Sequence, residues 1–307
     1  MDSQFEIIIV GAGPAGLTAA IYASRANMKV LLLEQESPGG KLVKTYKIEN
    51  YTGVQSSSGV DLAMSFMNHG LAFGAEIDFG EVVKVESSDK IKRVVLADGR
   101  EFTAKAVIVA TGTKERPLDV AMAERFTGRG ISYCAVCDGA FYRDKVVTII
   151  GGGNSALEEA LFITSLVEKV NIVIRRDQFR AEPKVVEEVL KNEKINVIYK
   201  HLPDSLIIED NNIVGLNIRH VDTKEVTPLM CSGIFPYIGA DPATSFLDKA
   251  ILNERGYILA KADMSTAIEG IFGAGDVIDK DLRQVVTATS DGAIAANSAV
   301  KYIKNNF

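Results

Sequence analysis

The sequence predicts an α/β fold of two Rossmann-like three-layer domains, with the second domain inserted into the first. Three observations lead to this prediction. A short apolar strand, a glycine-rich turn and an apolar helix follow one another twice, with the turns at residues 11–16 and 151–156. After each turn come a strand, several antiparallel strands, and an apolar strand leading to glycine and proline. The tail after residue 271 has no such unit of its own, so we expect it to complete the first domain.

The length and composition are those of a two-domain globular protein. A chain of 307 residues exceeds the size at which one hydrophobic core usually stops growing. The net charge of −6 argues against a general nucleic-acid-binding protein, which needs a basic surface. Three cysteines are too few for a disulfide scaffold.

The N-terminal segment predicts neither export nor membrane insertion. Its first residues are acidic, whereas a secretory signal begins with basic residues. Residues 7–24 are uncharged, but glycines and Pro14 interrupt them, so we interpret them as a strand, a turn and a helix. We therefore expect a cytoplasmic protein without membrane or nucleic-acid partners.

The first domain is expected to contain two parallel strands around a helix, then antiparallel strands and a final apolar strand. These elements are predicted at residues 7–10, 17–26, 29–33, 82–85, 93–96, 101–104 and 106–110. Asp98-Gly99 is a typical hairpin turn between two of the antiparallel strands. The last strand leads through Thr111-Gly112 to Pro117, where we expect the chain to cross to the second domain.

The second domain is expected to repeat this order. Its strands and helix are predicted at residues 146–150, 157–166, 170–174, 205–208, 214–219 and 233–237, with a turn at 210–212. Glycine and proline at 239–242 mark the return crossing. The predicted boundaries are therefore residues 1–114 and 243–307 for the first domain and 115–242 for the second.

The first glycine turn predicts a dinucleotide-binding site. Its glycines allow a tight turn, close approach of a pyrophosphate, and close packing of helix on strand, while the helix N-terminus receives the negative charge. The turn lies between a strand and a helix, and Glu34 ends the next strand. A carboxylate at that position accepts hydrogen bonds from ribose hydroxyls, which suits FAD or NAD.

The second glycine turn predicts a site with a different preference. It has the form Gly151, Gly153, Ala156, and Arg175 stands where the first domain has its carboxylate. Arg176 and Arg180 add two further positive charges. Guanidinium groups suit a 2′-phosphate, so we expect NADPH here; a solvated basic segment is the alternative. Two such sites in one chain suggest a flavoprotein in which NADPH reduces the flavin.

Cys134 and Cys137 are candidates for redox chemistry. Their spacing places them on one side of a helical turn and within reach of a disulfide. A zinc site would need four ligands, so we predict no metal. A structural disulfide is possible, but a redox-active dithiol fits an intracellular protein better. Asp138 follows directly and could transfer a proton or simply be an N-terminal helix charge, and Cys231 is expected to be a buried free thiol.

Together these motifs resemble the low-molecular-weight thioredoxin reductases. The resemblance covers nearly the whole chain, and its most diagnostic part is the cysteine pair just before the second glycine turn. The motifs that carry it are residues 11–16, 38–40, 134–139, 151–156, 175–181, 275–276 and 283–284.

The resemblance implies a homodimeric, NADPH-dependent FAD enzyme that reduces thioredoxin, with the cysteine pair in the NADPH domain. It implies that Cys137 lies nearer the flavin, that Cys134 is its partner and that Asp138 is the acid/base. It also implies that the two domains rotate about hinges, for which the Gly/Pro crossings are candidates.

The predicted cofactor contacts fall into two groups. For FAD they are Gly11, Gly13, Pro14, Ala15, Gly16, Glu34, Gly39, Gly40, Leu42, Asn50, Val83, Ala110, Thr111, Gly112, Gly275, Asp276, Arg283, Gln284 and Val285. For NADPH they are Gly151, Gly153, Asn154, Ser155, Arg175, Arg176, Arg180, Ile238 and Gly239.

The chain departs from the family pattern at three positions. Ile174 stands where the family usually has histidine, Val136 where threonine is common, and Lys41 where many relatives have glutamine. Alternative functions on the same scaffold are a flavin-dependent dithiol oxidase, a ferredoxin-linked reductase, and a non-catalytic redox-sensing or nucleotide-binding module. The three arginines argue against the first two, because neither needs NADPH.

Overall fold

The computed structural model describes residues 3–45, 48–87 and 90–307. The chain forms two compact units. The first unit comprises Met1–Lys114 and Asp241–Phe307, and the second comprises Glu115–Ala240.

The first unit is built on one mixed sheet with the strand order β3-β2-β1-β6-β5-β4, and β16 also pairs with β6. The parallel strands are β1 (Phe5–Val10), β2 (Val30–Glu34), β3 (Glu76–Phe79) and β16 (Ile271–Gly273). The antiparallel strands are β4 (Val82–Glu86) and β5 (Lys92–Leu96). Because β16 pairs with β6, the C-terminal tail contributes to the sheet of the first unit.

Strand β6 (Glu101–Val109) corrects one prediction. The segments 101–104 and 106–110, expected as separate strands, form one strand that ends at Val109. Ala104 pairs with Phe5 of β1 on one side and with Lys92 of β5 on the other. The strand continues past Lys105 because pairing with β1 runs from Ala104 to Val109, while the Lys105 side chain forms an ion pair with Glu6.

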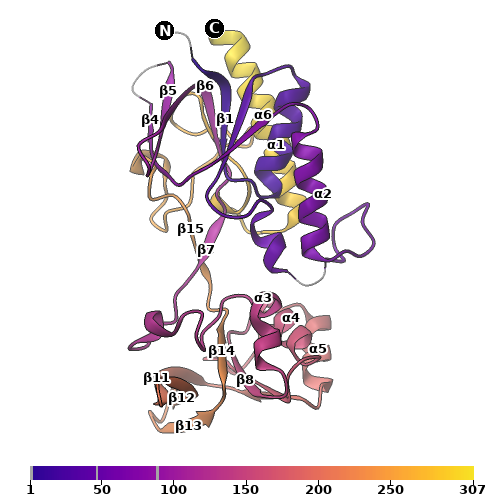
Figure 1. Ribbon diagram of the computed structural model, residues 1–307, viewed down its shortest axis with the longest axis vertical. Coiled ribbons are helices and arrows are strands. Elements are labelled where there is room, and N and C mark those ends of the chain that lie inside the picture. The colour runs from indigo at the N-terminus through magenta and orange to yellow at the C-terminus, as the bar shows by residue number, and fades with distance from the viewer. Residues whose placement is uncertain (1–2, 46–47, 88–89) are drawn as a thin grey trace. The chain divides into compact units, whose positions relative to one another are not determined.

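Three helices lie side by side next to this sheet: α1 (Pro14–Arg25), α2 (Gly59–Leu71) and α6 (Val285–Asn306) (Figure 1). Helix α1 starts three residues earlier than predicted, because Pro14 suits the first helical position, where no backbone N–H is needed. Helices α1 and α6 approach closely. A Cβ atom on Gly292 would lie 2.1 Å from the Ala15 carbonyl oxygen, so only glycine fits there.

The second unit has a fully parallel sheet with the order β10-β9-β8-β14 and a separate antiparallel sheet, β11-β12-β13. The parallel strands are β8 (Val146–Ile150), β9 (Lys169–Val173), β10 (Ile195–Ile198) and β14 (Gly233–Pro236). The antiparallel strands are β11 (His201–Glu209), β12 (Asn212–His220) and β13 (Val226–Met230). Its helices are α3 (Ala135–Asp138), α4 (Asn154–Ile163) and α5 (Pro183–Lys191).

The turn predicted at 210–212 joins β11 to β12. Asp210 and Asn211 have positive φ angles of 45° and 61°, which is the backbone of a two-residue hairpin turn, and Asn212 already belongs to β12. Short 3₁₀ helices complete the fold at Gly40–Lys44, Ala123–Phe126, Gly139–Tyr142, Lys249–Ile251 and Gly275–Val277.

The boundaries between the units fall within β7 (Thr113–Glu115) and β15 (Ala240–Pro242). These two strands pair with each other as a two-stranded sheet. Both units follow the strand–glycine turn–helix order, so the prediction of a doubled Rossmann-like α/β fold is confirmed. Among the residues that the structure describes, no helix is both long and apolar enough to span a bilayer.

Candidate active site

In the first glycine turn, two glycines pack closely against backbone atoms and the third has free space beside it. Gly11 has a φ of +103°, and a Cβ atom there would lie 2.5 Å from the Ala110 carbonyl oxygen. A Cβ on Gly16 would lie 1.8 Å from the Gly11 oxygen. A Cβ on Gly13 would meet no atom closer than Gly40 Cα at 4.0 Å. The turn therefore needs glycine for packing at two positions and leaves space for a ligand at the third.

Glu34 lies beside this turn, as predicted. Its Oε2 accepts a hydrogen bond of 2.7 Å from the Ala12 N–H. Its Oε1 accepts from the N–H groups of Gln35 and Glu36, each at 2.8 Å. Backbone donors thus hold the carboxylate at the end of β2, where it can accept further bonds from ribose hydroxyls.

Gly39 and Gly40 also meet the first turn. Both have positive φ angles, +112° and +56°. The Gly39 N–H donates to the Ala12 carbonyl oxygen at 2.7 Å, and a Cβ on Gly40 would lie 3.3 Å from Gly13 Cα. This second glycine pair therefore forms part of the same opening, and buried Leu42 follows it.

The tail brings a third segment to this region. Gly275 has a φ of +81°, and a Cβ there would lie 2.9 Å from the Ala15 Cβ, so the tail contacts the start of α1. Burial raises the pKa of the Asp276 carboxyl, while the positive charges of Lys41, Lys280 and Arg283 act in the opposite direction. Lys41, noted as a departure from the family pattern, thus places a positive charge near a predicted flavin contact.

Other predicted FAD contacts are held in place by interactions with residues that are distant in sequence. The Asn50 side-chain amide donates to Gln284 Oε1 at 3.1 Å, which joins two predicted contacts 234 positions apart. The Arg283 guanidinium stacks 4.5 Å from the centre of the Tyr257 ring. Thr111 Oγ1 donates to the Ala243 carbonyl oxygen at 2.8 Å.

Two further predicted FAD contacts, Val83 and Val285, lie outside the glycine turn. Val83 lies at a register shift in strand β4 with an exposed side chain, so its contact with a ligand stays a prediction. Val285 begins α6 and packs against the cluster around Leu42.

The second glycine turn has the same plan. Gly151 has a φ of +144°, and a Cβ there would lie 2.3 Å from the Tyr237 carbonyl oxygen, whereas a Cβ on Gly153 would meet nothing within 4 Å. The loop after β9 is attached to the turn by two bonds: the Arg180 N–H donates to the Gly152 oxygen, and the Glu182 N–H to Asn154 Oδ1, both at 2.7 Å.

This attachment brings the arginines to the second turn. Arg175, Arg176 and Arg180 are exposed beside it, which suits an anionic ligand. Ile174 is buried, so the position where the family has histidine belongs here to the core.

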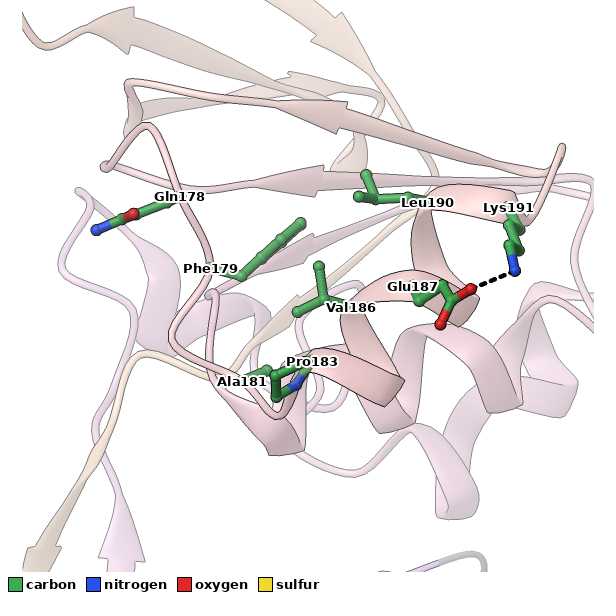
Figure 2. A pocket seen from close by; sticks show the side chains of 8 residues that line it. All are labelled: Gln178, Phe179, Ala181, Pro183, Val186, Glu187, Leu190 and Lys191. Atoms are coloured by element: carbon green, nitrogen blue, oxygen red, sulfur yellow. Dashed lines mark hydrogen bonds and ion pairs between the residues drawn. The ribbon is translucent and has the colours of Figure 1, made fainter.

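An open groove borders this loop (Figure 2). It lies between the loop and α5 and is lined by Gln178, Phe179, Ala181, Pro183, Val186, Glu187, Leu190 and Lys191. Glu187 and Lys191 form an exposed ion pair at its rim. None of the predicted NADPH contacts lines the groove, so it is a neighbour of the predicted site and not the site itself.

Cys134 and Cys137 form a disulfide bond, with Cα atoms 5.3 Å apart. The spacing argument is only partly right, because Cys134 is the N-cap of α3 and only Cys137 is helical. Cys134 is buried, and its Sγ accepts a hydrogen bond of 3.1 Å from the Cys137 N–H. Cys137 is exposed, and Asp138 ends the helix with its N–H donating to the Cys134 carbonyl oxygen.

Sequence reasoning missed Tyr237, which bonds to helix α3, and Glu159, which lies near Tyr237. The Tyr237 hydroxyl accepts a hydrogen bond of 3.1 Å from the Ala135 N–H, and burial and the nearby Glu159 raise its pKa. Glu159 is 8% exposed, and burial and Glu158 raise its pKa to about 8. Helical spacing could have revealed Glu159, because it lies four residues before buried Ile163.

Cys231 is a buried free thiol, as predicted, and burial raises its pKa to about 11. A thiol that ionises so reluctantly is a poor nucleophile. Within the described ranges, no group of three or more His, Cys, Asp and Glu side chains is placed to hold a metal ion.

Comparison with known proteins relates these features to one family. The profile of the pyridine nucleotide-disulphide oxidoreductases matches residues 5–292. The chain is 43% identical to the thioredoxin reductase of Bacillus subtilis over 306 residues, covering 99% of this chain and 96% of the relative. It is 40% identical to that of Listeria innocua over 304 residues, covering 99% and 95%. A crystal structure of Lactococcus lactis thioredoxin reductase matches with 41% identity, coverage of 98% and 100%, and a TM-score of 0.96.

Proposed function

The chain belongs to the pyridine nucleotide-disulphide oxidoreductase family, and from this membership we propose that it is a thioredoxin reductase that uses NADPH and FAD. The observation that carries the proposal is the Cys134–Cys137 disulfide, which lies in the same unit as the arginine-flanked glycine turn. The thioredoxin reductases named above match this chain over nearly their whole length.

We assign FAD to the first unit. Its glycine turn leaves open space at Gly13, and helix α1 begins there with no acidic residue in its first turn, which suits a pyrophosphate. Glu34 would accept from the ribose, and Asp276, Arg283 and Gln284 would hold the rest of the cofactor. When bound, FAD supplies the two-electron transfer that links NADPH oxidation to reduction of the disulfide.

We assign NADPH to the second unit. The open side of Gly153 and the N-terminus of α4 suit the pyrophosphate, and Arg175, Arg176 and Arg180 suit the 2′-phosphate. Ile238 and Gly239, which follow β14, complete the predicted contacts.

The protein's own residues then perform thiol–disulfide exchange. In the dithiol form, the Cys137 N–H is placed to stabilise a thiolate on Cys134. Asp138, adjacent to Cys137, takes up or delivers the proton that the exchange requires. Attack of one thiolate on the thioredoxin disulfide forms a mixed disulfide, and the second thiol resolves it. Thioredoxin leaves with two thiols, and the Cys134–Cys137 disulfide is restored.

We also propose a cytoplasmic homodimer whose units move about the β7 and β15 connections. Gly112 and Gly239 flank these strands with φ angles of +65° and +117°, conformations that favour glycine. Hinges absorb changes in backbone angles at a few such positions.

An anaerobic titration tests the proposed function. Addition of NADPH should bleach the flavin absorbance, and oxidised thioredoxin should restore it while gaining two thiols. Cys137→Ser should still bleach but lose thioredoxin reduction by at least about 1,000-fold, whereas Cys231→Ser should behave like the parent. A flavin that NADPH does not reduce would favour the ferredoxin-linked alternative, and thiol oxidation by O₂ without NADPH would favour the oxidase.

A further inference from the structure

We propose that Asp291, oriented by Lys280, is a positioning residue that holds the Gly275–Asp276 segment in the conformation that binds FAD. The inference rests on the proposed function, because it takes the first unit as the FAD site. Neither residue belongs to the motifs that carry the family resemblance.

Asp291 joins helix α6 to the Gly275 segment. Its Oδ2 accepts from the Gly275 N–H at 3.1 Å and from Lys280 Nζ at 2.5 Å. Lys280 Nζ also lies 3.4 Å from Thr287 Oγ1 on the first turn of α6. The segment is thereby attached to α6 at its start, through Gly275, and at its end, through Lys280.

The ion pair is largely buried, with side-chain exposures of 14% for Lys280 and 11% for Asp291. Removing two charges from water costs several kcal/mol per ion, and apolar side chains of similar size often serve stability as well or better. Fold stability alone is therefore a weak reason for such a pair. The need to hold the backbone of residues 275–280 in one conformation is a better reason for the pair. Asp291 bonds to both the first and the last residue of this segment.

The segment begins with a close approach of its backbone to helix α1. Gly275 has a φ of +81°, and a Cβ there would lie 2.9 Å from the Ala15 Cβ. A Cβ atom on Gly292, next to Asp291, would lie 2.1 Å from the Ala15 carbonyl oxygen, so α6 also approaches Ala15 closely here. Ala15 belongs to the first glycine turn, so the hydrogen bond from Gly275 to Asp291 places Asp276 beside that turn. Without an acceptor for the Gly275 N–H, we expect this segment to sample other conformations.

Two double variants isolate the contribution of this hydrogen bond. K280M/D291N removes both charges and keeps a side-chain oxygen that can accept from the Gly275 N–H. K280M/D291L removes both charges and the acceptor. The measurements are the dissociation constant for FAD, from flavin fluorescence on addition of FAD to apoprotein, the flavin midpoint potential, and the unfolding midpoint of each apoprotein.

We expect K280M/D291L to bind FAD at least about tenfold more weakly than K280M/D291N, with a displaced flavin potential and similar apoprotein unfolding midpoints. If the leucine variant does not fold, K280M/D291S replaces it, because the serine hydroxyl lies one bond short of the carboxylate oxygen. The double variant E187Q/K191M, which removes the exposed pair on α5, is the control and should bind FAD like the parent.

Equal FAD affinities of the two test variants, within about twofold, would overturn the inference. So would a loss of affinity that only follows a loss of apoprotein stability. A parent protein that binds no FAD would instead overturn the proposed function itself, so the two failures are distinguishable.

Discussion

A charged residue stands at the end of the second strand of the first unit and just after the second strand of the second unit, and the two charges are opposite. Glu34 ends β2, while Arg175 follows β9 by two residues. Both lie next to a glycine turn, Glu34 through its bond to Ala12 and Arg175 through the loop that Arg180 attaches to Gly152. A carboxylate repels a 2′-phosphate and guanidinium groups attract it. We therefore expect the opposite charges at these corresponding positions to distinguish the two predicted dinucleotide sites.

Neutralising the arginines should reduce the preference for NADPH over NADH. For R175Q/R176Q we expect the KM for NADPH to rise roughly 10- to 100-fold, because charge-assisted bonds to the 2′-phosphate are lost, with little change for NADH. Steady-state kinetics with both nucleotides is the measurement. K200Q, which removes a nearby exposed cation, is the control and should change both KM values little. Equal effects of R175Q/R176Q on both nucleotides would contradict the 2′-phosphate assignment.

Glu159 should make the stability of the protein depend on pH. An unperturbed glutamate has a pKa of 4.5, and burial raises that of Glu159 to about 8. Between these values the folded state keeps its proton while the unfolded state loses it. Unfolding then releases a proton, so this residue lowers the free energy of unfolding as pH rises, until about pH 8.

Glu159→Gln removes this titration. Its free energy of unfolding, relative to the parent, should therefore increase by roughly 1 kcal/mol per pH unit between pH 5.5 and 7.5. Urea unfolding at several pH values measures the difference. Glu188→Gln, on the exposed face of α5, should stay within about 0.5 kcal/mol of the parent throughout. A constant difference for Glu159→Gln would show that the buried carboxyl does not hold its proton.

At the scale of elements, the repeated strand–turn–helix order was predictable because it depends on local chemistry. β-branched strands, glycine turns and a proline at a helix start are all visible in the sequence. Helix α2 was not predicted, although Ser58 caps it by accepting from the Asp61 N–H, which is a recognisable sequence signal. The continuity of β6 was harder to predict, because Ala104 pairs not only with Lys92 across the hairpin but also with Phe5 of β1, which is distant in sequence.

The glycine turns combine a packing requirement with a ligand requirement, and the two can be separated. Gly16→Ala would place a Cβ 1.8 Å from the Gly11 oxygen, so we expect a loss of several kcal/mol of stability and of FAD. Gly153→Ala has free space and a φ of −98°, so thermal unfolding should change little. It should nevertheless weaken NADPH binding at least about fivefold, because the methyl group occupies the ligand side. Unchanged NADPH binding would mean that the open side of Gly153 does not face the ligand.

At the scale of the whole molecule, the partners of individual side chains could not be predicted. Asn50 bonds to Gln284 across 234 positions, and Tyr237 bonds to Ala135 across 102. Such pairs depend on how elements pack, which local patterns do not determine. Motifs predicted the candidate site residues, whereas the bonds of Asp291 to Gly275 and of Tyr237 to Ala135 required the structure.

The two units should fold and bind their cofactors separately. The second unit is continuous, contains its own apolar core, and has ends that meet, because the Arg116 N–H donates to the Gly239 oxygen at 2.9 Å. The cut ends of the first unit also meet, since the Ala243 N–H donates to the Gly112 oxygen at 3.1 Å. A linker of about three glycine and serine residues can therefore replace residues 115–240, because short loops cost little entropy to close.

We expect the shortened first unit to bind FAD and not NADPH, and residues 115–240 alone to bind NADPH within about tenfold of the full chain and to keep the disulfide. Calorimetric titration with each nucleotide and cooperative thermal unfolding are the measurements. Neither unit alone should reduce thioredoxin with NADPH, because the disulfide and the flavin are then on separate molecules. If the isolated second unit folds but binds FAD instead, the assignment of the two cofactors is reversed. If it folds and binds neither, its arginines are a solvated basic surface and not a nucleotide site.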